Sequence, residues 1–161
     1  MDMFWDAKRI EELKAFVFGD HSFLSSRRPK MAEFDSAKRD EVIEFISSTM
    51  GLSFSEALLK MIDMRGMTDP EVYKAANVDR RVFSKIRSNP DYQPSRSTAI
   101  RLCLALKTQL GEAMSLLEKA GFCLSRSKKA DLVVTYCLDH EIFDLNAVNE
   151  ALRLLDLEEL D

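Results

Sequence analysis

The chain has 161 residues, a formal net charge of −4, 46% hydrophobic and 31% charged residues. This length supports one domain with a sizeable core, or one domain with an arm. Five glycines and four prolines are few for a β-sandwich or barrel, so the composition favours helices. No apolar run approaches the ~20 residues that a membrane span needs, and the N-terminus lacks the order of a signal peptide. We therefore expect a cytoplasmic protein without a membrane segment.

Residues that bind metals or carry catalysis are sparse. Cys103, Cys123 and Cys137 lie far apart in apolar sequence and are expected to be reduced core cysteines. His21 and His140 are the two histidines, and no CxxC or HxxxH pair exists, so no metal site and no cofactor is expected. The sequence also lacks a glycine-rich phosphate loop and a Ser/His/Asp order. It therefore predicts no catalytic residues, and the protein is not expected to be an enzyme.

Two helices are expected within residues 1–50. The first covers about residues 4–18 and ends at Gly19. The second begins at Asp35 or Ser36 and ends near Met50, before Gly51. These helices are expected to form an arm, a dimerisation hairpin or a cover for the following domain. The apolar residues on one face of the second helix are Val42, Phe45 and Ile46, with Thr49.

Two capping boxes open the next pair of helices. In Ser53-Phe-Ser-Glu56 and Thr68-Asp-Pro-Glu71, each hydroxyl and each glutamate can satisfy a free backbone N–H. Gly66 ends the first of these helices, and Pro70 stands in the first turn of the second, where its missing N–H has no cost. The pattern predicts a helix from Ser53 to Gly66 and a short helix after Thr68.

A three-residue corner separates that short helix from another. Asn77 tolerates the left-handed conformation that a tight corner requires, and Asp79 can cap the next helix. Apolar residues of this next helix face inward, whereas cations and serines face outward. The outward residues are Arg80, Arg81, Ser84, Lys85, Arg87 and Ser88.

The remaining sequence predicts further helices. A turn-rich loop, residues 89–94, leads to a helix that starts at Ser97 or Thr98 and is apolar over most of its girth, which indicates a central position. An amphipathic helix ends at Gly121, and two more cover about residues 128–140 and 146–156. The expected fold is an all-α, five-helix bundle of residues 51–122. Residues 1–50 form an N-terminal helical arm, and residues 123–161 form a C-terminal helical extension.

Charge is unevenly distributed along the chain. Residues 71–107 contain eight cations and three anions, whereas residues 131–161 contain nine anions and one cation. A locally basic module therefore stands beside an acidic segment. These charges indicate either binding surfaces or ordinary solvated helix faces.

The stretch from Ser53 to Gly121 resembles the Cro/C1-type (XRE-like) helix-turn-helix family of bacterial and phage regulators. The resemblance is carried by the five helices, the short second and third, the loop ending in Q93-P-S-R-S-T98, and the closing L116-L-E-K-A-G121. Residues 54–155 also resemble an extended form that occurs alone or fused behind bacterial macro domains. The roughly 50 residues before the module are too short for a macro domain.

The resemblance implies a DNA-binding transcriptional regulator of the cytoplasm, with double-stranded DNA as its partner. The helix Arg80–Ser88 would enter the major groove, where Arg80, Arg81 and Lys85 occupy the base-reading positions. Another set would contact phosphates and orient the protein without reading sequence. These phosphate-contacting residues are Thr68, Arg87, Ser88, Asn89, Tyr92, Gln93, Ser95 and Arg96.

Two departures from the family pattern support an alternative. Tyr73 stands where the family usually has a small residue, and should widen or rotate the crossing of the second and third helices. Asp69 puts a carboxylate near a phosphate position. The alternative is a protein-interaction adaptor or inhibitor in bacterial stress or phage conflict, binding a partner through the acidic C-terminal segment. A homodimer is expected for the regulator, through the N-terminal helices or through the acidic C-terminal pair.

Overall fold

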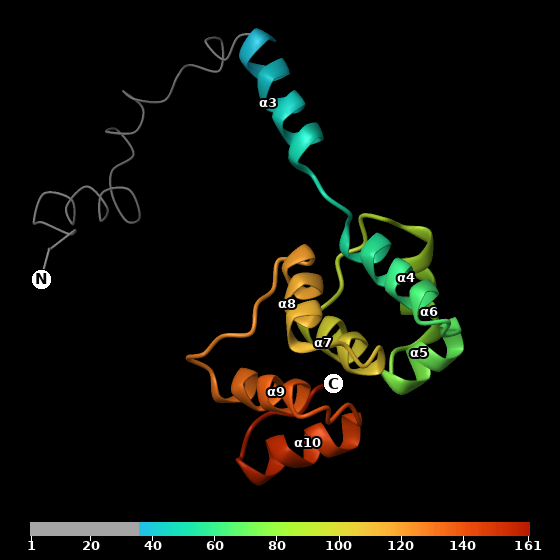
Figure 1. Ribbon diagram of the computed structural model, residues 1–161, viewed down its shortest axis with the longest axis vertical. Helices are drawn as coiled ribbons and strands as arrows, with labels where there is room; N and C mark the ends of the chain where they lie inside the picture. The colour runs from blue at the N-terminus through green and yellow to red at the C-terminus, as the bar shows by residue number, and fades with distance from the viewer. Residues whose placement is uncertain (1–35) are drawn as a thin grey trace, which may run out of the picture. The chain divides into compact units, whose positions relative to one another are not determined.

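The computed structural model describes residues 36–161, which divide between two compact units, Met1–Met50 and Gly51–Asp161 (Figure 1). Every regular element in the described part is a helix, which confirms the all-α class. The helix expected over residues 4–18 lies outside the described residues. The boundary expected near residue 122 stays a prediction, because residues 51–161 form one unit.

In the first unit, α3 (Ser36–Thr49) is a helix with no buried residue. Its bounds agree with the helix expected from Ser36 to about Met50. Four large apolar side chains of α3 and that of Met50, the residue after it, are 45–69% exposed, so this segment presents apolar area that no described residue buries. These side chains are Val42, Ile43, Phe45, Ile46 and Met50.

The segment Ser36–Met64 is long and apolar enough to pass for a membrane span, contrary to the expectation from sequence. Residues 50–53 are not helical, however, and divide the segment into α3 and α4 (Phe54–Met64). Leu58 and Ile62 of α4 are buried in the core of the second unit. Much of the apolar character of this segment therefore belongs to a core helix.

Caps define the helices of the helix-turn-helix. Ser53 caps α4 and Thr68 caps α5 (Asp69–Ala75), and both capping boxes are complete, as predicted. Asp79 caps α6 (Arg80–Ser88) by accepting a hydrogen bond from the Arg81 N–H at 2.7 Å. Each cap satisfies backbone donors that have no partner within the helix.

The centre of the second unit is α7 (Arg96–Ala105), which packs on α5, α8 (Leu110–Lys119) and α10 (Leu145–Leu154). Every residue from 98 to 106 is buried. The sequence predicted this position, because a helix that is apolar on all sides must be surrounded by protein. Its burial fixes the framework on which α5 and α6 stand.

The C-terminal extension is a helix pair, α9 (Lys129–Asp139) and α10, whose members pack on each other (Figure 1). Both begin and end within two residues of the predicted bounds. After α10 the chain returns to α7: Leu160 exchanges hydrogen bonds with the Asn149 side chain, and the Ser97 hydroxyl donates to the Asp161 carbonyl. The extension is thus tied to the start of α7.

Candidate nucleic-acid interface

The outward face of α6 presents three cations. Phe83 and Ile86 are buried and anchor the helix to the bundle, whereas Arg80, Arg81 and Lys85 are exposed. Within residues 36–161, none of the three has an ion-pair partner. Arg81 and Lys85 are four residues apart, so they lie one above the other on one helix face. The fold therefore exposes all three predicted base-reading cations on α6, with Arg81 and Lys85 on one face and Arg80 beside the hollow next to Tyr73.

A buried arginine holds the corner that orients α6. Asn77 adopts φ 51°, the left-handed conformation predicted for it. The Arg101 guanidinium, from α7, donates to the carbonyl oxygens of Ala76 and Asn77 at 3.2 and 2.6 Å, and to the Thr98 hydroxyl at 3.3 Å. Burial lowers the pKa of Arg101, and the negative charge of Asp161 opposes this effect. Arg101 thus supports the corner and is not available to a ligand.

The two departures noted in the sequence lie between α5 and α6. The rings of Tyr73 and Phe83 are 5.7 Å apart and tilted by 53°, a favourable aromatic geometry. Tyr73 is half-buried, and a hollow of about 260 Å³ opens beside it. Tyr73 is therefore accommodated by packing.

Asp69 binds Arg87, one of the predicted phosphate contacts. The Arg87 Nε and one terminal nitrogen each donate to an Asp69 carboxylate oxygen at 2.6 Å, a bidentate pair between α5 and α6. These hydrogen bonds raise the pKa of Arg87, although burial opposes the effect. A phosphate approaching Arg87 must compete with this carboxylate.

Arg96 is likewise held by protein. One of its nitrogens lies 2.8 Å from the Asp131 carboxylate and 2.9 Å from the Cys123 carbonyl oxygen. The Asp131 side chain is 4% exposed and also accepts a hydrogen bond from the Ser125 N–H. Arg96 therefore joins α7 to the loop before α9 and to α9 itself.

The other predicted phosphate contacts fall into two groups. Thr68, Gln93 and Ser95 are used by caps or loops: Thr68 and Ser95 cap α5 and α7, and the Gln93 amide donates to the Ala120 carbonyl oxygen at 2.8 Å. Ser88 and Asn89 are exposed at the end of α6, and Tyr92 packs partly on the core. Contact of these residues with phosphate stays a prediction.

The sequence does not indicate how these charges pair. Asp69 and Arg87 are 18 residues apart, and Arg96 and Asp131 are 35 apart, so no local spacing indicates either pair. A signal did exist for Arg101, because a lone cation in an otherwise apolar central helix requires buried partners. Three of the eight cations in residues 71–107 are thus committed within the protein.

The remaining side chains with chemical potential are possible metal ligands and the cysteines. Among the described residues, no group of three His, Cys, Asp or Glu side chains lies close enough to hold a metal ion. Cys103 and Cys137 are buried, as predicted, but Cys123 is exposed. The prediction that Cys123 is a core cysteine was wrong. Cys123 lies in the loop between α8 and α9 rather than at a core-facing position of a helix.

Residues 57–119 match the family model of the Cro/C1-type helix-turn-helix DNA-binding domain. The match extends from α4 to the last residue of α8, and so contains the corner and α6. No curated protein and no solved structure matches the chain.

Proposed function

Because residues 57–119 form a Cro/C1-type helix-turn-helix domain, we propose that the protein is a transcriptional regulator that binds double-stranded DNA sequence-specifically. In this proposal α6 enters the major groove. The observation that carries it is that Arg80, Arg81 and Lys85 are all exposed on α6, without ion-pair partners among residues 36–161. The proposal includes a cytoplasmic location and a role without catalysis.

The chemistry of base recognition fits these side chains. An arginine can donate two parallel hydrogen bonds to O6 and N7 of guanine, and a lysine can donate to the same atoms. Each good bidentate contact contributes about 1–3 kcal/mol of discrimination against another base. Arg80, Arg81 and Lys85 are therefore the proposed reading residues, and guanine-containing steps are the proposed target.

Backbone contacts are proposed for a smaller set of residues than the sequence implied. Ser88, Asn89 and Tyr92 follow the reading residues at and after the end of α6, where they can contact the DNA backbone. Arg87 and Arg96 contribute only where DNA displaces Asp69 or Asp131 from them. We therefore expect the affinity for DNA to fall less steeply with salt concentration than it would if Arg87 and Arg96 also contacted phosphates.

The ion pairs of Arg87 and Arg96 are the observation that favours a second candidate function. A domain whose phosphate-contacting cations are neutralised, in a chain of net charge −4, suits a protein-interaction adaptor or inhibitor. The acidic C-terminal segment would supply the partner surface. In this candidate the fold is kept and DNA binding is lost.

Titration of the full chain against a duplex of its own promoter, and against a scrambled duplex, at two salt concentrations tests the proposal. We expect the promoter to bind more tightly, and Arg81→Ala to reduce promoter affinity about tenfold while changing scrambled-DNA binding less. Arg126→Ala is the matched control, because Arg126 is exposed in the loop before α9 and lies outside α6. Equal, weak binding of both duplexes would contradict the proposal and favour the adaptor.

A further inference from the structure

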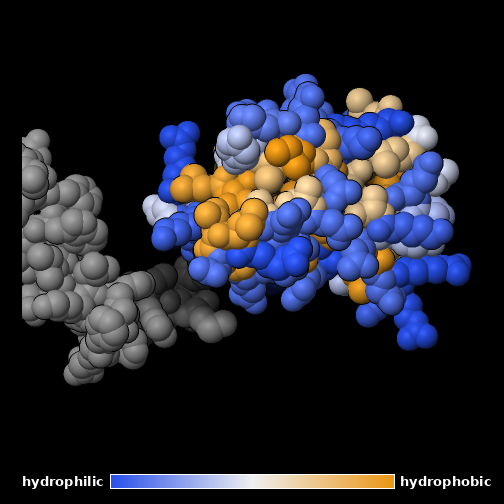
Figure 2. Space-filling view, turned by 90° about the horizontal axis from the view of Figure 1, so that it is seen from below, coloured by the Kyte–Doolittle hydropathy of each residue, from blue (hydrophilic) through white to orange (hydrophobic). Residues whose placement is uncertain are grey.

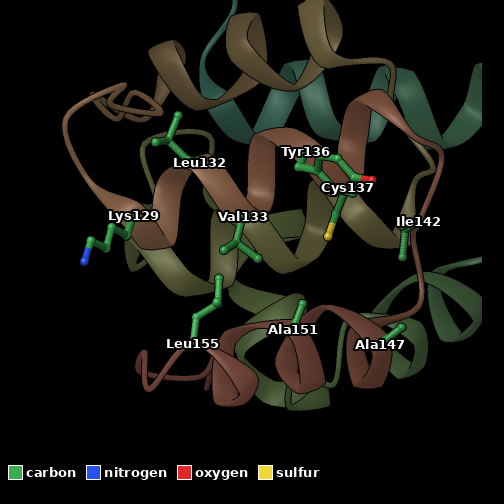
Figure 3. A pocket seen from close by; sticks show the side chains of 9 residues that line it. All are labelled: Lys129, Leu132, Val133, Tyr136, Cys137, Ile142, Ala147, Ala151 and Leu155. Atoms are coloured by element: carbon green, nitrogen blue, oxygen red, sulfur yellow. The ribbon is translucent and has the colours of Figure 1, made fainter.

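The C-terminal helix pair carries an apolar groove that the DNA-binding proposal does not use. The groove has a volume of about 650 Å³ and lies between α9 and α10 (Figure 3). Val133 and Cys137 project from α9 toward α10, where Ala147 and Ala151 face them with side chains too short to fill the gap. Among the nine described residues that line it, Lys129 is the charged one.

The rim of this groove exposes large apolar side chains to solvent. Leu132, Tyr136 and Leu155 line it and are 45%, 58% and 60% exposed. Figure 2 looks onto the end of the bundle that carries α9 and α10, and shows apolar surface gathered there between hydrophilic areas. Contiguous exposed apolar surface of this kind marks an interaction site in a soluble protein.

Helix α3 presents apolar side chains that could fill a groove of this kind. On α3, Val42, Phe45 and Ile46 recur at the i, i+3, i+4 spacing with which a helix places anchors in a groove, and the exposed Ile43 and Met50 widen this apolar face. At about 1.5 Å per residue, the 14 residues of α3 extend about 21 Å and the 11 residues of α9 about 16 Å. One α3 helix can therefore cover the whole groove.

Charge complementarity gives the direction of docking. Arg39 lies one turn before Val42 and Ile43, at the N-terminal end of the apolar face. Asp139 and Glu141 lie exposed at the C-terminal end of α9, and Lys129 lies at its other end. If α3 runs antiparallel to α9, Arg39 meets these two carboxylates, and the uncharged end of α3 meets Lys129.

We propose that α3 of a second copy of this chain docks in the α9/α10 groove, and that the exchange is reciprocal. Residues 50–53 join α3 to α4, and four residues span at most about 14 Å. α3 of a second copy can approach the groove without the constraint of this tether. Reciprocal docking covers both helices and both grooves and forms a closed twofold dimer.

The test uses the full chain and two charge substitutions at exposed positions. Phe45→Glu places a carboxylate on the apolar face of α3, and Leu155→Glu places one in the groove. Ser47→Glu, on the polar side of α3, and Leu154→Glu, which is 77% exposed and outside the groove lining, are the matched controls. Molar mass by light scattering is measured over a range of concentrations, with thermal unfolding to show that each variant is folded.

We expect the wild type and both controls to be dimers, and Phe45→Glu and Leu155→Glu each to raise the dimer dissociation constant at least about tenfold. Mixing these two variants restores a dimer with one copy of each, because one intact α3 then faces one intact groove. A dimeric Leu155→Glu protein would show that α3 pairs with α3, and a dimeric Phe45→Glu protein that groove pairs with groove. Either result, or a monomeric wild type, overturns the proposal. The readout is independent of DNA binding.

Discussion

Asp69 limits the positive charge that the helix-turn-helix offers to a nucleic acid. Its bidentate pair with Arg87 spans α5 and α6, so the carboxylate both joins the two helices and neutralises a cation at their edge. The Asp69 side chain is 31% exposed and that of Arg87 is 46% exposed, so the pair contributes little to stability. Its larger effect is on what Arg87 can bind.

We therefore predict that Asp69→Asn raises the affinity for promoter and scrambled DNA alike. Removing the carboxylate charge leaves Arg87 able to contact a phosphate, which adds about one unit to the salt slope. Titrations at several salt concentrations measure this. Glu150→Gln, which removes an equal charge from an exposed position of α10 outside the groove lining, serves as control. Asp69→Asn combined with Arg87→Ala should cancel the gain. An unchanged slope in Asp69→Asn would show that Arg87 does not face DNA.

The elements are joined by a few polar residues placed where helices begin and end. Arg101 connects α7 to the corner between α5 and α6, and Arg96 connects the start of α7 to α9. Both arginines come from the central helix. The position of the reading helix and that of the C-terminal pair therefore depend on the same framework.

Because Arg96 connects α7 to α9, we predict that Arg96→Ala lowers the free energy of unfolding by about 1–3 kcal/mol. Asp131 is buried and would lose its cation, but the 37% exposure of the Arg96 side chain reduces the effect. Denaturant unfolding measures the change, and amide exchange should accelerate in residues 121–131. Arg126→Ala should change neither. Unaltered stability together with weaker DNA binding would instead assign Arg96 to phosphate contact.

For the whole molecule, the helices could be predicted because their signals are local. The capping boxes at Ser53 and Thr68, the left-handed Asn77 and the apolar girth of α7 each belong to a few consecutive residues, and the structure has all of them. The pairs Asp69–Arg87 and Arg96–Asp131 could not be predicted, because they form only when distant segments pack. The cations that the sequence assigned to one surface are consequently divided between reading positions and structural ones.

A buried thiol in the core makes the free energy of unfolding depend on pH in the alkaline range. Burial raises the pKa of the Cys103 thiol to about 12, above the value of 9.0 expected for an exposed thiol. The folded state therefore holds this proton more tightly than the unfolded state, so its contribution is complete below pH 9 and is lost as pH rises from 9 toward 12. We predict that the free energy of unfolding falls less steeply in that range for Cys103→Ala than for the wild type. Parallel urea titrations at pH 8, 9 and 10 check this, and identical slopes would contradict it.

The unbroken burial of residues 98–106, in α7 and its C-cap, has a consequence for variation among natural or engineered sequences. Nearly every substitution there changes the packing of several neighbouring helices at once, so α7 should accept few replacements in any screen for folded protein. The apolar face of α3 contributes nothing to that core and should accept polar replacements freely in the same screen. Selection for activity rather than for folding would then show whether the apolar residues of α3 are retained for a partner.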